Sequence, residues 1–457
     1  MKLSKLLLGA VSFVAMSSAA FAADAVVEEV PVVAGYNWSG FYVGVGVGAG
    51  ANVSELSTEI IPGLSLDGIG GEGVFGELTV GYDYMVAPRF VIGALADVHY
   101  SNIETRLEVP ALDGLDVSVS DTYGFDVGLR AGYLFTPTTL GYVLGGYAWQ
   151  NAETDGLDGL APGGDFDWDR DGYFVGVGLE TVITGNWTLK TEYRFTQFGE
   201  HNLLEEFDAP DGILDSETSR HTFHLAANYR FGMQDGGGAS FEVPAYNWTG
   251  FYVGGALGAG AVVHELNSNL APGGIEFNGL GGEGIFGELN AGYDYDFGTW
   301  VAGVLVDGRY SGISTELDTG AIGAGTISVD ADYGFDVIAR AGVKLNESTL
   351  AYALAGYSWQ HFDLEFPSGL GIDDIDWDSS GFSVGGGLEA AVSENVSVNL
   401  EYRYSQFEDH DFSSDLGESD GALEVEPSFH TVRIGLNYRW GAVGKGPVGK
   451  GPVVAKY

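Results

Sequence analysis

Hydrophobic and polar residues alternate with a period of two through most of this chain. Residues 187–197 are typical: one face carries Leu189, Tyr193 and Phe195, and the other face is polar. The polar positions are Thr188, Lys190, Glu192, Arg194 and Thr196. The same pattern recurs at 222–231 and 431–440. Because successive side chains of a β-strand point to opposite faces, the alternation predicts strands with one apolar and one ionic face.

The lengths of the connections between these strands predict a β-barrel. Eight strands are predicted in the first half of the chain, at 38–51, 74–86, 89–106, 121–135, 140–152, 171–184, 187–199 and 220–231. Short turns at 87–88, 136–138 and 185–186 alternate with loops of roughly 14 to 22 residues, rich in Gly, Asp and Glu. Short turns at one end and long loops at the other are typical of an antiparallel, all-β transmembrane barrel of the outer membrane.

The whole pattern occurs twice. YNWSGFYVG at Tyr36 returns as YNWTGFYVG at Tyr246, and EYRFTQF at Glu192 returns as EYRYSQF at Glu401. A repeat this long is a duplicated domain, because solenoid units run to about 20 to 50 residues. The predicted domains are 36–232 and 246–441, joined by a Gly-rich linker at 233–245 and followed by a Gly/Pro/Lys tail at 442–457.

The first residues predict export. Lys2 and Lys5 precede an apolar run at 6–16, and the sequence Ala-Phe-Ala at 20–22 is a cleavage site. We therefore expect a cleaved signal peptide at 1–22 and a periplasmic segment at 23–35. The apolar run is shorter than the roughly 20 residues that a membrane-spanning helix needs.

Composition narrows the class further. The chain has no cysteine, which excludes a disulfide-stapled secreted fold. Its formal charge is −45, and removal of Lys2 and Lys5 with the signal makes it −47. So acidic a surface repels phosphate backbones and excludes nucleic acid as a partner.

The nine tryptophans are predicted to mark the two lipid interfaces, where barrels carry aromatic girdles. Trp38, Trp187, Trp248, Trp300 and Trp440 fall at the short-turn ends of predicted strands, taken as periplasmic. Trp149, Trp168, Trp359 and Trp377 fall at the long-loop ends, taken as extracellular. A soluble sandwich would place most of its tryptophans mid-strand in the core.

Charged residues on the inward face form a candidate network in each lumen. In the first copy they are Glu77, Asp97, Asp126, Arg130, Glu180, Lys190, Glu192, Arg194 and Arg230. In the second copy they are Glu288, Asp307, Asp336, Arg340, Glu389, Glu401, Arg403 and Arg439. A charged constriction would select solutes, but we favour a salt-bridged plug, because small barrels are filled by their own side chains.

Two eight-stranded barrels and one sixteen-stranded barrel both fit this topology. We favour two barrels, because 233–245 is longer than the other short-turn connections and each copy repeats a full set of first and last strands. Inward positions of the first strand are Gly40, Gly44, Gly46 and Gly48, which suit a narrow lumen.

Several segments resemble a known family. They are the two YNW(S/T)GFYVG openings, GYFVGVGLE, NWTLKTEYRF, the closing NYRFG and NYRWG, and the tail GPVVAKY. Together they make the chain similar to the small alphaproteobacterial outer-membrane β-barrel proteins, often called outer-membrane immunogenic or porin-family proteins. The resemblance implies one eight-stranded barrel per unit and an abundant surface protein. It also implies that relatives act as envelope-stabilising proteins, weak porins or haem binders.

Two local motifs are weaker. Residues 167–172, DWDRDG, match the start of a calcium loop, but Gly178 stands where the bidentate Glu is required. His221 and His430 align between the copies, with Ser219 and Ser428 two residues before them. A hydrolase would need a converging carboxylate as well. We predict no enzyme activity, catalytic site, cofactor or metal.

The sequence thus predicts an integral outer-membrane surface protein with a structural envelope role and acidic extracellular loops. The alternative is a porin for small hydrophilic solutes, and the third hypothesis is a lipid-modifying or haem-binding barrel. Expected partners are outer-membrane lipid, lipopolysaccharide and the outer-membrane assembly machinery, which would read Trp440 or Phe231 at a strand end. The tail, with Lys445, Lys450 and Lys456, could contact peptidoglycan, although a disordered extension is favoured.

Overall fold

The computed structural model describes residues 35–58, 64–110, 115–157, 164–202, 215–232, 235–238, 246–269, 274–318, 325–367, 373–413 and 421–440. The predicted signal peptide, all but the last residue of the segment 23–35, and the tail lie outside these ranges. Among the described residues, no helix is long and apolar enough to cross a membrane.

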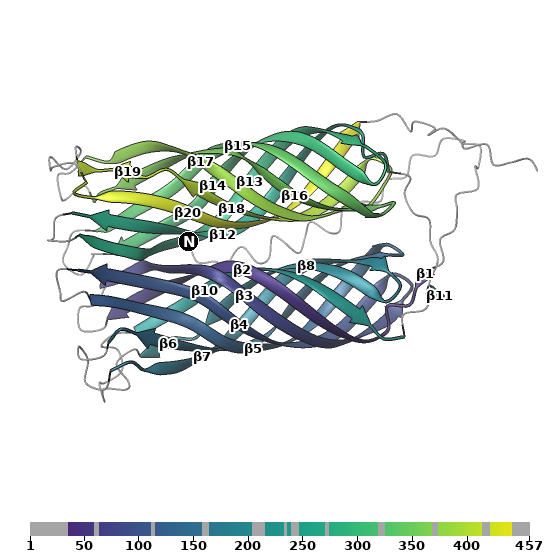
Figure 1. Cartoon of the computed structure of the whole chain (residues 1–457), viewed down its shortest axis with the longest axis horizontal. Coiled ribbons are helices and arrows are strands. Elements are labelled where there is room, and N and C mark those ends of the chain that lie inside the picture. Colours follow the sequence, from purple (N-terminus) through teal and green to yellow (C-terminus); the bar gives the residue numbers. More distant parts are fainter. Residues whose placement is uncertain are drawn as a thin grey trace, which may run out of the picture.

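Eight long antiparallel strands of the first copy close into a barrel (Figure 1). They are β2 (Gly40–Thr58), β3 (Leu64–Ala87), β4 (Phe90–Val109), β5 (Leu115–Thr136), β6 (Thr139–Asp155), β7 (Asp167–Thr184), β8 (Trp187–Phe198) and β10 (Asp215–Arg230). The last strand pairs with the first along its whole length, from Asp215 opposite Ser57 to Arg230 opposite Tyr42. A two-residue strand, β9 (His201–Asn202), pairs with the start of β10.

The second copy repeats this architecture. Its strands are β12 (Gly250–Ser268), β13 (Ile275–Asp296), β14 (Trp300–Asp318), β15 (Thr326–Asn346), β16 (Thr349–Glu365), β17 (Ile375–Ala391), β18 (Val396–Phe407) and β20 (Glu424–Trp440), with a short β19 (His410–Asp411) beside β20. The pairing of β20 with β12 closes the ring. Because each copy pairs its own first and last strands, the sixteen-stranded alternative is wrong and the chain forms two barrels.

The strands extend further towards the long-loop end than the sequence predicted. β4 and β5 leave only residues 110–114 between them, and β2 and β3 leave only 59–63, so long loops at these two places were a wrong prediction. The ladders continue past the apolar region with polar side chains on both faces, as at Glu104 opposite Ser120. The alternation of hydrophobic and polar residues ends at the expected boundary of the lipid, but the hydrogen-bonded pairing of the strands continues beyond that boundary.

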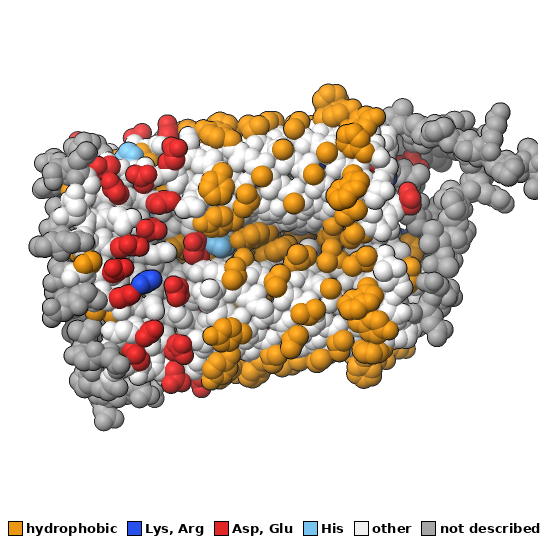
Figure 2. Space-filling view, in the orientation of Figure 1, with side chains coloured by type: hydrophobic (Ala, Val, Ile, Leu, Met, Phe, Trp, Pro, Cys, Tyr) orange, Lys and Arg blue, Asp and Glu red, His pale blue; other side chains and the backbone are white. Residues whose placement is uncertain are grey.

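The outer surface is divided into an apolar and an acidic region. Exposed apolar side chains cover the strands from the short turns past their middle, including Val45, Leu78 and Leu129 on the first barrel. In Figure 2, acidic side chains gather instead towards the opposite end of the visible face. This division is the one expected for a barrel that crosses a lipid bilayer.

The two barrels lie side by side and are in direct contact. The apolar part of the contact includes Phe223 and Tyr402, whose rings stack with centroids 5.3 Å apart, and the small residues Ala51, Val53, Ala261 and Val263. Thr139 and Thr349 are hydrogen-bonded across the contact near the short turns, with their Oγ1 atoms 2.8 Å apart.

Four residues of the predicted linker form a short strand. Residues Asp235–Gly238 form β11, which pairs antiparallel with β1 (Gly35–Tyr36) just before the first barrel. The chain therefore returns, after β10, to the segment that leads into the first barrel.

Candidate functional site

The most distinctive chemistry of the molecule lies in the two lumens. Every predicted lumen charge is at most 4% exposed. Alternation explains their position, because their strand neighbours, such as Leu129 beside Arg130, point outward and are exposed. The charges of each barrel form two layers, one near the short turns and one at mid-height.

The short-turn layer of the first barrel consists of Asp83, Arg130, Glu180 and Arg230. Arg130 Nη1 and Arg230 Nη1 each lie 2.9 Å from a different oxygen of Glu180. Both guanidinium groups also pair with Asp83. Two cations and two anions are thus fully paired in a region that water barely reaches, as buried charges require.

The short-turn layer of the second barrel is built from the matching residues Asp294, Arg340, Glu389 and Arg439, but Arg439 Nη1 donates to the Trp248 carbonyl where Arg230 Nη1 pairs with Glu180. Arg340 Nη1 lies 2.8 Å from Glu389 Oε2, and Arg439 Nη2 lies 2.6 Å from Asp294 Oδ2. Sequence reasoning missed Asp83 and Asp294. A stricter use of alternation would have found them, since Asp83 is in phase with Glu77 and Asp294 with Glu288.

Aromatic rings complete this layer, and they correct part of the tryptophan prediction. Arg230 lies over the ring of Trp38 at 4.8 Å and over Tyr42 at 5.0 Å. Trp38 is fully buried and its Nε1 donates to the Pro137 carbonyl at 3.1 Å. Trp248 is buried in the same way in the second barrel. Neither lies at a lipid interface, because the segment before each first strand folds into the barrel end.

The other tryptophans divide between the two faces. Trp377 is also wrongly placed by the prediction, because it is buried against Phe362 with stacked rings 5.0 Å apart. Trp168 is half-buried and stacks on His201. Trp187, Trp300 and Trp440 are exposed on the outer surface, and Trp149 and Trp359 stack on Phe125 and Phe335. For these last five, an interfacial girdle stays a prediction.

The central layer of the first barrel is organised around Arg194. Its Nη1 lies 2.9 Å from Asp97 Oδ2 and 2.6 Å from Asp126 Oδ2, and its Nη2 lies 2.7 Å from Glu192 Oε1. Lys190 Nζ lies 3.3 Å from Glu77 Oε1 and completes the layer. One guanidinium therefore holds together carboxylates from β4, β5 and β8.

The central layer of the second barrel keeps the carboxylates and changes the cations. Arg403 Nη1 lies 2.8 Å from both Asp307 and Asp336, and its Nε lies 2.6 Å from Glu401. Arg433 pairs with Glu288, and Arg309 Nη1 lies 2.8 Å from Asp336 Oδ2. The residues at these positions in the first barrel are His224 and His99, while Asn399 takes the place of Lys190.

The long-loop ends of the two lumens differ in polarity. In the first barrel Arg170 and Arg220 both pair with Asp121 and lie over the ring of Phe198 at 5.1 Å. The second barrel has an apolar cluster here instead, which includes Phe362, Phe407 and Phe429. Sequence reasoning did not anticipate this difference.

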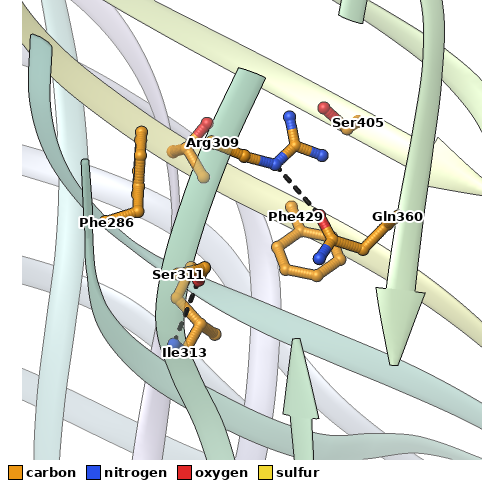
Figure 3. A pocket seen from close by; sticks show the side chains of 8 residues that line it. Phe286, Arg309, Ser311, Ile313, Gln360, Ser405 and Phe429 are labelled. Carbon is orange, nitrogen blue, oxygen red and sulfur yellow. Dashed lines mark hydrogen bonds between the residues drawn. The ribbon is translucent and has the colours of Figure 1, made fainter. Parts of the chain in front are cut away.

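Two small cavities lie in the described part of the second lumen. One cavity of about 10 Å³ lies beside Arg309, whose Nε donates to Gln360 Oε1 at 3.0 Å (Figure 3). A second, also of about 10 Å³, lies against Tyr252 and Glu288. Each volume suits a single water molecule and no larger solute.

The serine–histidine pairs do meet a carboxylate, but it comes from the other barrel. His221 Nε2 lies 3.0 Å from Glu283 Oε2, to which Ser219 Oγ also donates. In a hydrolytic triad the histidine stands between serine and acid, whereas here the acid stands between serine and histidine. The arrangement is a clamp between barrels and not an activated nucleophile.

The calcium-loop match is not a loop. Residues 167–171 are the first part of β7 and pair with β6, from Asp167 opposite Glu153 to Asp171 opposite Trp149. An extended strand cannot wrap its side chains around one ion as a twelve-residue loop does.

Comparison with known proteins agrees with this architecture. The model of the outer membrane protein beta-barrel domain matches twice, over residues 7–231 and 237–439. The chain is 32% identical over 233 residues to the 31 kDa outer-membrane immunogenic protein of Brucella melitensis, a match that covers 47% of this chain and 95% of that protein. It is 29% identical over 206 residues to the 22 kDa outer membrane protein of Rhizobium leguminosarum, covering 43% of this chain and 80% of the relative.

Among solved structures, Neisserial surface protein A (NspA) aligns with 42% of this chain and 98% of its own, at 17% identity and a TM-score of 0.25. So low a score adds nothing to the argument. The match of the family model over both copies does carry weight, and each relative aligns with about half of this chain. The chain is an outer-membrane protein and belongs to the outer membrane protein beta-barrel domain family, with the domain present in two tandem copies.

Proposed function

We propose that this protein has a structural role in the outer membrane, as a fixed pair of plugged barrels that presents an acidic surface to the exterior. The observation that carries the proposal is the filling of both lumens by paired, buried charges. Solute transport and catalysis need an open path or an accessible reactive group, and the described lumens offer little support for either.

The energetics of the ion pairs support a closed resting state. Removing one partner of a buried pair typically costs 3–5 kcal/mol, because the other charge is left uncompensated. A path through the first barrel would have to displace Arg194, which contacts three carboxylates, and then the short-turn layer below it. This cost argues against the porin hypothesis.

The contact between the barrels supports a structural role in a second way. Two covalently linked barrels that are also fastened side by side occupy the membrane as one wide, stiff unit. The acidic end visible in Figure 2 would face outward and could bridge to lipopolysaccharide phosphates through divalent cations. Lipopolysaccharide and the assembly machinery are the partners that we propose on this basis.

Single-channel conductance in a planar bilayer tests the proposal. We expect folded full-length protein, verified by heat-dependent gel mobility, to give no large uniform current steps. A general porin reconstituted in the same bilayer serves as the positive control. Large, uniform steps from the folded protein would refute the plugged state and make solute transport the function.

A further inference from the structure

We propose that the central layer of the first barrel binds a divalent transition-metal ion, with Zn²⁺ as the preferred candidate, between Asp97, His99 and Asp126. One potential ligand atom from each of these residues lies within 4.8 Å of the others. The three side chains are 3%, 9% and 2% exposed. His99 and Asp97 belong to β4 and Asp126 to β5, so an ion here would join two neighbouring strands.

One oxygen of each carboxylate is available to coordinate a metal ion. Arg194 approaches Asp97 and Asp126 through the Oδ2 atom of each. Within the described part of the chain, neither Oδ1 atom has a hydrogen-bond partner. A buried carboxylate oxygen without a partner is costly, and a cation is one of the few groups that satisfies it fully.

The histidine is oriented as a metal ligand. Gln150 Nε2 donates to the carbonyls of Tyr123 and Asn151, which fixes its Oε1 as an acceptor. Arg220 also donates to this oxygen, and His99 Nε2 lies 2.8 Å from it. His99 Nε2 is therefore the protonated nitrogen. The free lone pair is on Nδ1, which lies 3.7 Å from Asp97 Oδ1. A histidine that binds a metal through one ring nitrogen usually donates its other N–H to an acceptor of this kind, which fixes the tautomer.

In the second barrel an arginine occupies the place of the histidine ligand. Arg309 stands at the position of His99, and its Nε donates to Gln360 as His99 does to Gln150. The Oδ1 atoms of Asp307 and Asp336 also lack hydrogen-bond partners, so the difference between the barrels lies in the cations. Arg309, Arg403 and Arg433 face four carboxylates there. In the first barrel Lys190 and Arg194 pair with the matching carboxylates, and His99 and His224 stand where the second barrel has Arg309 and Arg433. A metal ion bound by His99 would place positive charge where the second barrel has the guanidinium of Arg309.

The ligand set selects the class of ion. One imidazole nitrogen and two carboxylate oxygens suit Zn²⁺, which binds such atoms at about 2.0–2.2 Å and leaves a fourth position for water. The ligand atoms would have to move together by about 1 Å to reach these distances. Because the site is enclosed, we expect the ion to be captured while the barrel folds, before its strands close.

Metal analysis of the full-length protein tests the site. The chain would be refolded in detergent with Zn²⁺, washed with EDTA to strip surface ions, and its zinc measured by mass spectrometry. We expect about one zinc per chain, because the described residues hold one such group of three ligands. The matched variant is H99R, which gives the first barrel the arginine of the second. It should fold, as judged by heat-dependent gel mobility, and should hold less than about a tenth of the zinc, because the guanidinium takes the place of both ligand and charge.

The reciprocal variant, R309H, gives the second barrel the histidine and should raise the content towards two zinc ions per chain. An EDTA-washed wild-type protein without zinc would overturn the proposal. Zinc that persists in folded H99R would also overturn it, because the ion would then be bound elsewhere, for example by acidic residues of the surface.

Discussion

His430 Nε2 lies 2.9 Å from Glu72 Oε2, although the two residues belong to different barrels. Ser428 donates to the same oxygen at 2.6 Å. The opposite clamp, formed by Glu283 with His221 and Ser219, repeats this geometry with the barrels exchanged. Each barrel thus gives a glutamate from its second long strand and receives one at its last strand. The pair of barrels has an approximate twofold relationship that arises from the gene duplication.

Removal of both glutamates should weaken the association of the barrels. The variant E72A/E283A loses two clamps, and each hydrogen bond to a charged group contributes about 1.5–3 kcal/mol. With a protease site inserted at 239–245, the two halves of the wild-type protein should copurify after cleavage, and those of the variant should separate. The control is E153A, which removes an exposed glutamate of β6. Halves of the variant that stay together as well as the wild type would contradict the role of the clamps.

A disulfide should form across the contact near the short turns. Thr139 and Thr349 are buried with Oγ1 atoms 2.8 Å apart, and the chain has no cysteine of its own. The variant T139C/T349C should therefore cross-link in the oxidising periplasm. The measurement is non-reducing electrophoresis after cleavage at 239–245. In the control T139C/V304C the second cysteine replaces an exposed side chain of β14, and the halves should separate.

Loss of the central arginine should destabilise the first barrel strongly. R194M removes the partner of Asp97, Asp126 and Glu192, and we expect the free energy of unfolding to fall by about 3–5 kcal/mol. Urea unfolding in lipid vesicles measures this change. R106M removes an ion pair whose side chains are 49% and 45% exposed, and because solvent screens this pair the variant should change the free energy of unfolding far less than R194M does. Equal effects of the two variants would contradict the importance of the lumen network.

Small residues on the inward face of β2 should be essential. A Cβ at Gly46 would lie 2.7 Å from Glu77 Oε1 and 2.9 Å from the Cβ of Ala226. G46A should therefore cost about 1–3 kcal/mol through overpacking. At Gly287 a Cβ would meet nothing within 4 Å, so G287A should be nearly neutral. The comparison uses the same unfolding measurement, and a neutral G46A would show that the lumen can relax.

Lipid should quench only the outward tryptophans. Single-tryptophan proteins that retain Trp187, Trp300 or Trp440 should lose fluorescence in vesicles of brominated lipid, because these side chains are 45%, 61% and 54% exposed. Proteins that retain Trp38 or Trp248 should not, since these rings lie inside the barrel ends. Strong quenching of Trp38 would place it in the lipid and contradict the fold of the segment before β2.

Sequence alone determined the eight long strands of each copy and the direction of most of their side chains. The reason is that a period of two is a local property: it placed Arg130 and Glu180 in the lumen and Leu129 on the outside without any knowledge of strand pairing. The same logic would have placed Asp83 there. It failed at the long-loop ends, where ladders such as the one through Glu104 and Ser120 continue in water and hydrophobicity no longer reports the pairing.

Only the tertiary structure decided which groups meet. Closure of β2 on β10 and of β12 on β20 depends on strand edges far apart in the chain, so the sequence left two barrels and one wide barrel open. The positions of Trp38 and Trp248 depend on how a short segment folds back into the barrel end. The clamp of Glu72 on His430 and the gathering of Asp97, His99 and Asp126 depend on barrel register and on the seating of one barrel against the other. These are long-range relationships, which a pattern of period two does not contain.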